Sequence, residues 1–187
     1  MNGFIRNTSA AVAELPEPPN HDQKPRRCVN HLGMWSVSSA KHGCGMQAML
    51  DNTPTTYWQS EGQQPHHISV QFEKRMAIQE VWLYLNYKSD ESYTPSKITL
   101  AVGTNVLDLE ECSILSVTQP DGWVCFPLPA GTDLVYGNLF RMFITANHDN
   151  GRDSHVRQVK LMAPPSAFLP PVLQFQNVDW AQHASLR

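Results

Sequence analysis

The stretch IQEVWLYLNYKSDESYTPSKITLAVG, residues 78–103, decides the fold class of this chain. Its two ends, IQEVWLYLNY (78–87) and KITLAVG (97–103), are rich in the branched and aromatic residues that favour β-strands. The polar segment between them contains the serine, aspartate and proline that are typical of a loop. The stretch therefore predicts two strands joined by a polar loop.

Further segments of similar length and character lie on both sides of this stretch. They cover residues 66–72, 113–119, 122–128, 139–147 and 156–163. Turn-forming pieces such as EGQQP, PDG and HDNGRD separate them. No segment shows a long apolar period of 3.6 residues, and only GCGMQAMLDN (43–52) has the spacing of a short helix. About eight short strands with little helix predict an all-β fold, and a two-sheet jelly-roll β-sandwich fits that number.

The flanks of this body differ from it in composition. Residues 1–30 are polar and carry several prolines, which predicts a flexible N-terminal arm. Residues 165–187 are interrupted by prolines that break regular structure, which predicts a C-terminal tail. One domain over residues 31–164 is expected between them. We expect the following side chains to be largely buried in its core: Trp35, Phe72, Trp82, Val102, Phe143 and Val159.

Composition excludes several classes of function. The formal charge of −3 gives no basic field that would attract nucleic acid. The sequence has no apolar run of about 20 residues, so no membrane span is expected, and the N-terminus lacks the apolar run of a signal peptide. Four cysteines without a CxxC pair indicate free thiols rather than a zinc site or a disulfide framework. A reducing compartment, the cytosol or nucleus, follows.

The residues that could carry catalysis do not assemble into a convincing set. HDNGRDSH (148–155) offers two histidines and acidic neighbours, but no second cluster completes the three or four ligands of a zinc site. Residues 153–155 contain Asp, Ser and His, yet adjacent residues do not easily form a triad, and no Gly-x-Ser-x-Gly elbow is present. Asp90, Glu91 and Asp153 could act as the paired carboxylates of a glycosidase, although short acidic loops are more often solvated. We therefore predict no metal, no cofactor and no enzyme activity.

Two polar loops remain as candidate binding sites. The first covers residues 86–96, directly after the most apolar predicted strand, and the second covers residues 146–158. The second loop places an amide, a guanidinium, a carboxylate and two imidazoles around Gly151, where glycine permits a positive φ and a tight turn. On composition alone, solvated turns are the commoner interpretation of both loops. Loops at the end of a rigid sandwich are nevertheless a usual place for binding, and we expect residues 88–94 and 148–155 to lie side by side.

Long motifs in these regions resemble a known family. TYWQSEGQQPHHISVQF (56–72), YKSDESYTPSKI (87–98) and NHDNGRDSHVRQVK (147–160) closely resemble the DOC-domain subunits of the anaphase-promoting complex, and WSVSSAKHGCG (35–45) resembles the start of that domain. The resemblance implies a galactose-binding-like jelly roll without catalytic residues. DOC domains also occur inside other ubiquitin ligases, but the short chain and a tail without a ligase domain favour the complex subunit.

The resemblance further implies a role, partners and a site. The role is that of a non-catalytic substrate-recognition and processivity subunit of a ubiquitin ligase, which holds the destruction box together with a WD40 coactivator. The implied partners are other subunits of the complex, including a tetratricopeptide-repeat scaffold, and destruction-box substrates such as cyclins, in the nucleus and cytoplasm. The family's destruction-box positions fall on Ser92, Asn150, Arg152, Asp153 and His155.

The end of the chain is a second implied contact. The family typically ends in Ile-Arg, which docks in a groove of the repeat scaffold, and here the last residues are Leu186 and Arg187. Leucine keeps the apolar volume of isoleucine but moves the branch from Cβ to Cγ. A frayed polar terminus is the alternative interpretation of this end.

A different function on the same fold also fits the sequence. Jelly rolls of this kind serve as carbohydrate-binding modules, and fold alone does not separate the two functions. Sugar modules usually present exposed aromatic platforms and are often secreted, whereas no signal peptide is predicted here. Binding to a sugar array, compared with association with subunits of the complex, would separate the two hypotheses.

Overall fold

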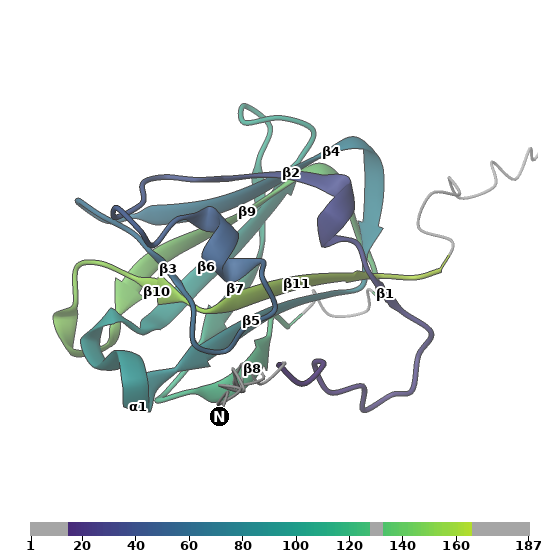
Figure 1. Ribbon diagram of the computed structural model, residues 1–187. Helices are drawn as coiled ribbons and strands as arrows, with labels where there is room; N and C mark the ends of the chain where they lie inside the picture. Colours follow the sequence, from purple (N-terminus) through teal and green to yellow (C-terminus); the bar gives the residue numbers. More distant parts are fainter. Residues whose placement is uncertain (1–14, 128–132, 166–187) are drawn as a thin grey trace, which may run out of the picture.

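The computed structural model describes residues 15–127 and 133–165, which form two packed antiparallel sheets (Figure 1). The larger sheet has the strand order β2-β4-β9-β6-β7, the smaller one has the order β1-β11-β5-β8, and β3 pairs with β10. The strands are β1 (Arg27–Cys28), β2 (Gly33–Val37), β3 (Trp58–Gln59), β4 (His66–Ile78), β5 (Glu80–Asn86), β6 (Pro95–Gly103), β7 (Glu110–Ser116), β8 (Asp121–Cys125), β9 (Val135–Asn147), β10 (His155–Val156) and β11 (Gln158–Ala163). The helices are α1 (Tyr87–Asp90) and the 3₁₀ turns η1 (Asn30–Leu32), η2 (Met46–Met49), η3 (Glu91–Tyr93) and η4 (His148–Asn150).

The core lies between the two sheets and is built by period-2 alternation. On β9, Phe140, Met142 and Ile144 are fully buried, and on β5, Leu83 and Leu85 face them from the opposite sheet. Alternate residues of a strand point to opposite faces, so each of these strands contributes one buried row. The predicted all-β jelly-roll fold is confirmed.

Five of the six predicted core residues are buried, and Phe143 is the exception. It is only half-buried, because its neighbours Met142 and Ile144 occupy the inward positions of β9. Phe143 therefore points to the outer face of the larger sheet, where its ring lies 6.1 Å from that of His67 on β4. The run LFRMFIT carries apolar residues on both faces of the strand, so the sequence alone did not show which face points into the core.

The N-terminal segment differs from the flexible arm that we expected. Leu15, Pro18 and Val29 are buried against the sandwich, and β1 pairs with β11, although residues 19–25 are exposed. Leu15 is 3% exposed, the Nζ of Lys160 lies 2.6 Å from the Glu17 carboxylate, and the indole N–H of Trp123 donates to the carbonyl oxygen of Pro16. The folded unit thus begins before residue 31, because this segment both pairs as a strand and buries an apolar side chain.

Strand connections place all the candidate binding loops at one end of the sandwich. The segment α1–η3 joins the end of β5 to the start of β6, and η4 follows the end of β9. Since β6 and β9 are paired antiparallel, with Pro95 opposite Asn147, the two loops emerge beside each other. Figure 1 shows them together at the lower left of the molecule.

Two expectations from composition can be compared with the described residues. All four cysteines are free thiols. Among residues 15–127 and 133–165, no helix has the length and apolar character needed to cross a membrane. The short helix expected within residues 43–52 is present as η2.

Candidate functional site

The loops at residues 88–94 and 148–155 contact each other directly, as predicted. The backbone N–H of His148 donates to the carbonyl oxygen of Thr94 at 2.9 Å, and the Nδ1 of His148 lies 2.9 Å from the same oxygen. At the outer side of the loops, the Tyr87 hydroxyl donates to the Asp149 carboxylate at 3.0 Å. The two loops therefore form one continuous surface.

The closest approach between the loops depends on Gly151. A Cβ added to Gly151 would lie 1.8 Å from the carbonyl oxygen of Ser92, far inside van der Waals contact. We had expected a left-handed backbone at Gly151, but its φ is −59°. Glycine is required here because there is no space for a side chain. The positive φ angles belong instead to Asp149 at 50° and Asn150 at 57°, with Glu91 at 46° in the other loop. Such conformations cost free energy in non-glycine residues and are concentrated at functional sites.

A buried charge cluster lies beneath the loops. Arg157 makes a bidentate ion pair with Asp90, with the Nε at 2.8 Å from one carboxylate oxygen and Nη2 at 2.8 Å from the other. The Nδ1 of His155 lies 3.0 Å from the same carboxylate. The third guanidinium nitrogen, Nη1, donates to the carbonyl oxygen of Pro54. One side chain, Arg157, thus holds the first loop, the second loop and the segment before β3 together.

The ionisation of Asp90 reflects these contacts. Burial would by itself raise the pKa of the Asp90 carboxyl, but the hydrogen bonds from His155 and Arg157 outweigh it and lower the pKa below its ordinary value of 3.8. The interpretation of Asp90 as a solvated loop acid is therefore wrong. Its charge is used by Arg157 and His155 inside the protein.

His155 is a buried member of the site. Its ring is stacked between those of Tyr57, at a centroid distance of 4.1 Å, and Tyr93, at 4.4 Å. The residue is 8% exposed. Its position in a polar loop suggested an exposed side chain, but His155 is buried and stacks on Tyr93, a residue that is 39% exposed.

The other predicted site residues differ in exposure. Asn150 and Arg152 are exposed, whereas Ser92 and Asp153 are half-buried. The carbonyl oxygen of Arg152 lies 2.8 Å from the Nε2 of His66, which is itself buried at the start of β4. The second loop is therefore fixed at its backbone while the side chains of Asn150 and Arg152 stay exposed, with the Nε of Arg152 4.0 Å from the Asp153 carboxylate.

Unused hydrogen-bonding capacity gathers at the same place. The Oγ1 of Thr94, the Oδ1 of Asp153 and the Nε2 of His155 are buried and have no hydrogen-bond partner within the described part of the chain. Buried polar atoms in native proteins nearly always have a partner. These three atoms are shielded from solvent beneath the loops, so they do not form part of the exposed binding surface.

The alternative sites weighed from the sequence do not form here. The Ser154 hydroxyl donates to the Asn147 side chain at 2.9 Å, and His155 faces Asp90 rather than Asp153, so residues 153–155 do not form a triad. No group of three or more potential metal ligands occurs in residues 15–127 and 133–165. Leu186 and Arg187, predicted to dock on a scaffold, lie outside the described residues.

Arg157, Tyr57 and Tyr93 are the site residues that the sequence did not identify. Arg157 lies in a segment that alternates like a strand, and its ion-pair partner Asp90 is 67 positions away. Tyr57 and Tyr93 were inside quoted motifs, but no local pattern indicated that they enclose a histidine ring. Only the tertiary fold brings these residues together.

Sequence comparisons place the chain in a family of relatives. A family model described as "Anaphase-promoting complex, subunit 10" matches residues 11–182. The chain is 38% identical over 182 residues to anaphase-promoting complex subunit 10 of Drosophila melanogaster, covering 91% of this chain and 93% of that protein. It is 39% identical over 183 residues to the Homo sapiens protein of the same name, covering 91% and 96%. The Dictyostelium discoideum protein is 46% identical over 127 residues, or 68% of each chain.

Solved structures share the fold at low sequence identity. The family 32 carbohydrate-binding module of C. perfringens NanJ, solved with galactose, superposes with a TM-score of 0.62 at 8% identity, covering 73% of this chain and 98% of that one. A second module, from Clostridium perfringens and solved with GalNAc-β-1,3-galactose, gives a TM-score of 0.59 at 10% identity, covering 70% and 95%. These likenesses are evidence for the galactose-binding-like jelly roll alone.

Proposed function

The chain belongs to the anaphase-promoting complex subunit 10 family, and from this premise we propose that it is the substrate-recognition and processivity subunit of that ubiquitin ligase. In this role it binds the destruction box with a WD40 coactivator and performs no chemistry itself. The observation that carries the proposal is the meeting of the two loops at one end of the sandwich, with exposed side chains above a fixed base.

The geometry suits an extended peptide better than a reaction. Asn150 offers an amide that can both donate and accept, and Arg152 offers a guanidinium, at exposed positions on either side of Gly151. Peptide main chains carry alternating donors and acceptors, so a mixed set of this kind is complementary to a segment without regular structure.

The coactivator supplies the rest of the binding surface in this proposal. The two loops are small, and a short peptide that is disordered before binding loses conformational entropy when it is bound. A co-receptor that holds the other side of the degron raises the effective concentration of the substrate at the loops. Processivity follows, because a substrate that stays bound longer receives more ubiquitin before it leaves.

The test compares two matched double variants. We expect Asn150→Ala/Arg152→Ala to lower the affinity for a destruction-box peptide, presented with the coactivator, by about tenfold or more, as truncation of interface anchors does. The control is Glu73→Ala/Lys74→Ala, which removes two exposed polar residues on β4, far from the loops. The control should keep the melting temperature of the unmodified chain, since exposed polar residues contribute little stability. The loop variant should lower the melting temperature only slightly, because alanine tolerates the left-handed φ of Asn150 less well than asparagine does.

Two results would contradict the proposal. One is equal degron binding by both variants, and the other is a loss of complex assembly in the loop variant, which would make the loop a structural contact. Binding of galactose-containing sugars without binding of destruction-box peptides would instead favour a carbohydrate-binding module.

The C-terminal residues are proposed as a separate contact. Leu186 supplies an apolar anchor, and Arg187 supplies a guanidinium, a combination suited to a groove with acidic residues. Deletion of both residues should weaken association with the tetratricopeptide-repeat scaffold without abolishing it. Unchanged co-purification of the truncated chain at high salt would rule this contact out. We also propose action in both nucleus and cytoplasm, which imaging of a tagged chain would test.

A further inference from the structure

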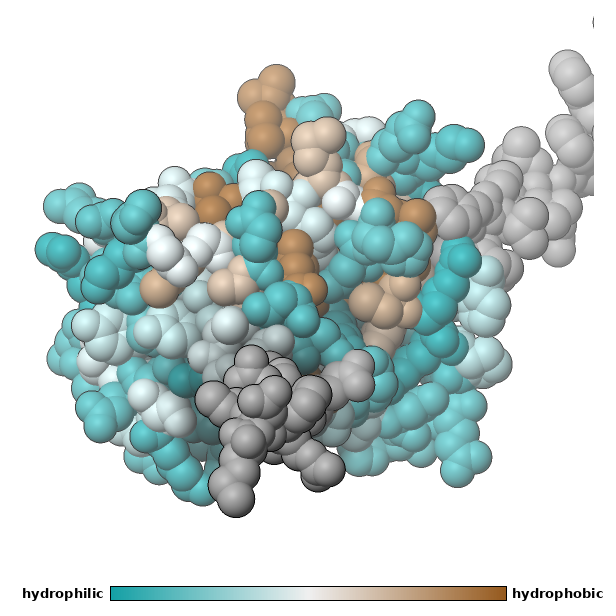
Figure 2. Space-filling view, viewed as in Figure 1, coloured by the Kyte–Doolittle hydropathy of each residue, from teal (hydrophilic) through white to brown (hydrophobic). Residues whose placement is uncertain are grey.

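The loop that joins β6 to β7 has an apolar tip. Turn tips usually carry polar residues or glycine, but here the turn positions are Val106 and Leu107. Val106 is 58% exposed and Leu107 is 94% exposed, the highest value among the exposed large hydrophobic residues described. Figure 2 shows hydrophobic atoms protruding at the top of the molecule, where Figure 1 draws this loop.

The loop is held in one shape by its own hydrogen bonds. One carboxylate oxygen of Asp108 accepts from the backbone N–H groups of Thr104, at 2.9 Å, and Asn105, at 2.8 Å, and the other accepts from the Thr104 hydroxyl. The Asn105 side chain accepts from the N–H of Leu107 at 2.8 Å. A Cβ added to Gly103 would lie 2.7 Å from the carbonyl oxygen of Asp108, so the loop closes tightly on its base. The apolar tip is therefore fixed in solvent by specific bonds.

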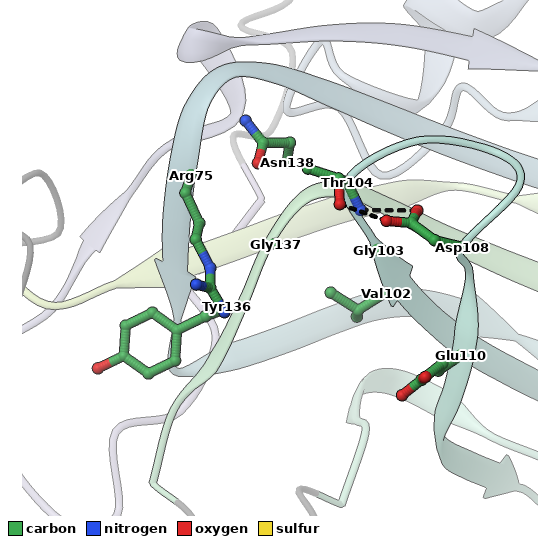
Figure 3. Close-up of a pocket in the computed structure, with 9 residues that line it drawn as sticks. All are labelled: Arg75, Val102, Gly103, Thr104, Asp108, Glu110, Tyr136, Gly137 and Asn138. Atoms are coloured by element: carbon green, nitrogen blue, oxygen red, sulfur yellow. Dashed lines mark hydrogen bonds between the residues drawn. The ribbon is translucent and has the colours of Figure 1, made fainter.

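The surroundings of the tip are acidic and hollow. Glu110 and Glu111 follow it directly, are exposed, and have no ion-pair partner within the described residues. A pocket of about 320 Å³ opens at the base of the loop. Figure 3 shows Glu110 on one side of this pocket and Arg75, whose guanidinium lies over the Tyr136 ring, on the other. A partner that covers the tip thus meets carboxylates on the β7 side and a ready-made cavity.

The tip and the candidate degron site lie at opposite ends of one strand. β6 begins at Pro95, one residue after Thr94 of the first loop, and ends at Gly103, before the apolar tip. Eight steps along a strand span about 26 Å. A partner bound at the tip therefore leaves the degron loops uncovered.

We infer that Val106 and Leu107 form a docking knob that inserts into an apolar pocket, rimmed by basic side chains, on another protein subunit of the complex. A preorganised apolar tip binds with little loss of conformational entropy, because the loop is already ordered. The flanking Glu110 and Glu111 select a basic rim, since complementary charge steers association and disfavours other partners. Such a contact would anchor the subunit by the end of the sandwich that faces away from the substrate.

The experiment uses the full chain reconstituted with the purified subunits of the complex. Val106→Ser/Leu107→Ser removes the apolar surface and keeps the residues that bond the loop. The matched control is Met34→Ser, which removes an apolar side chain that is 77% exposed on β2, at the other edge of the same sheet. We expect the knob variant to lose about tenfold or more of its affinity for the complex, and the control to retain full affinity.

A charge variant tests the chemistry of the rim. Glu110→Lys/Glu111→Lys should weaken association at low salt, and this loss should shrink as ionic strength rises, because exposed charges are screened. The knob variant should lose affinity at every salt concentration. Melting temperatures and binding of a destruction-box peptide should stay unchanged in all variants.

Several outcomes would overturn the inference. Full assembly of the knob variant would do so, as would an equal loss in Met34→Ser. Self-association of the chain that depends on Leu107, measured by sedimentation, would identify a second copy as the occupant instead. A fall in peptide binding would connect the tip with the degron site. By contrast, a chain that assembles through the knob but binds no destruction box would contradict only the function proposed above.

Discussion

Replacing Asp90 should destabilise the domain far more than its place in a polar loop suggests. The Asp90 side chain is 3% exposed and that of Arg157 is 11% exposed. Asp90→Ala leaves the Arg157 guanidinium buried without its counter-charge and removes the carboxylate that faces His155. Breaking one side of a buried ion pair typically costs about 3–5 kcal/mol. For a chain of this length, each kcal/mol lowers the melting temperature by about 2–4 °C, so a fall of about 6–20 °C is expected.

The assay is thermal and urea unfolding, with a matched surface pair as control. Lys88 and Asp121 form an ion pair whose side chains are 79% and 48% exposed. Asp121→Ala should cost less than about 1 kcal/mol, because exposed ion pairs contribute little. Asp90→Asn, which keeps the shape and one acceptor oxygen, should fall between the two.

The pH dependence gives an independent check. The folded pKa of Asp90 is lowered, so its contribution to stability is present above the unfolded pKa and is lost as pH falls through the folded pKa. The difference between the unmodified chain and Asp90→Ala should therefore be full at neutral pH and shrink below about pH 4. An Asp90→Ala variant as stable as Asp121→Ala at neutral pH would refute the view that this ion pair anchors the loops.

Two further predictions follow from packing. Gly151→Ala should push the second loop away from the Ser92 carbonyl, cost about 1–3 kcal/mol of folding stability as an overpacking change and lower destruction-box binding. The control is Gly45→Ala, whose added Cβ meets only a side-chain oxygen at 3.4 Å, and it should change neither stability nor binding. On β9, Phe140→Ala should cost about 3–5 kcal/mol because the ring is fully buried. Phe143→Ala, on the outer face, should cost about 1 kcal/mol in denaturant titrations, and equal losses would show that the strand register is wrong.

The parts of the fold that the sequence predicted are those with strong local signals. The runs around β5 and β6 combine branched residues with flanking turn chemistry, and both strands lie where they were expected. β2 (Gly33–Val37) and the two-residue β3 were not predicted as strands from pattern, because short segments give too few residues for an alternation to be recognised. Their partners fix them: β2 pairs with β4, and β3 pairs with β10.

The contact between the two loops was predicted from the sequence, but the interactions beneath them were not. Adjacent loops and their polar side chains could be placed from motifs, since each motif is local. His155 and Arg157 both contact Asp90, from which they are separated by 65 and 67 residues in the sequence. No local sequence pattern indicates contacts over such separations. The requirement for Gly151 has the same origin, because the atom that excludes a side chain belongs to Ser92 in the other loop.

The buried charges are better explained by loop placement than by stability. A buried ion pair loses much of its attraction to the cost of removing both charges from water, and apolar residues in the same space often stabilise a protein as well. Here, however, the pair joins three separate chain segments and supports a loop in which Asp149 and Asn150 hold left-handed conformations. Such conformations persist only when the surroundings fix them. A surface fixed in this way before binding loses little entropy when a ligand arrives, which suits the short and flexible destruction-box peptide that we propose as its ligand.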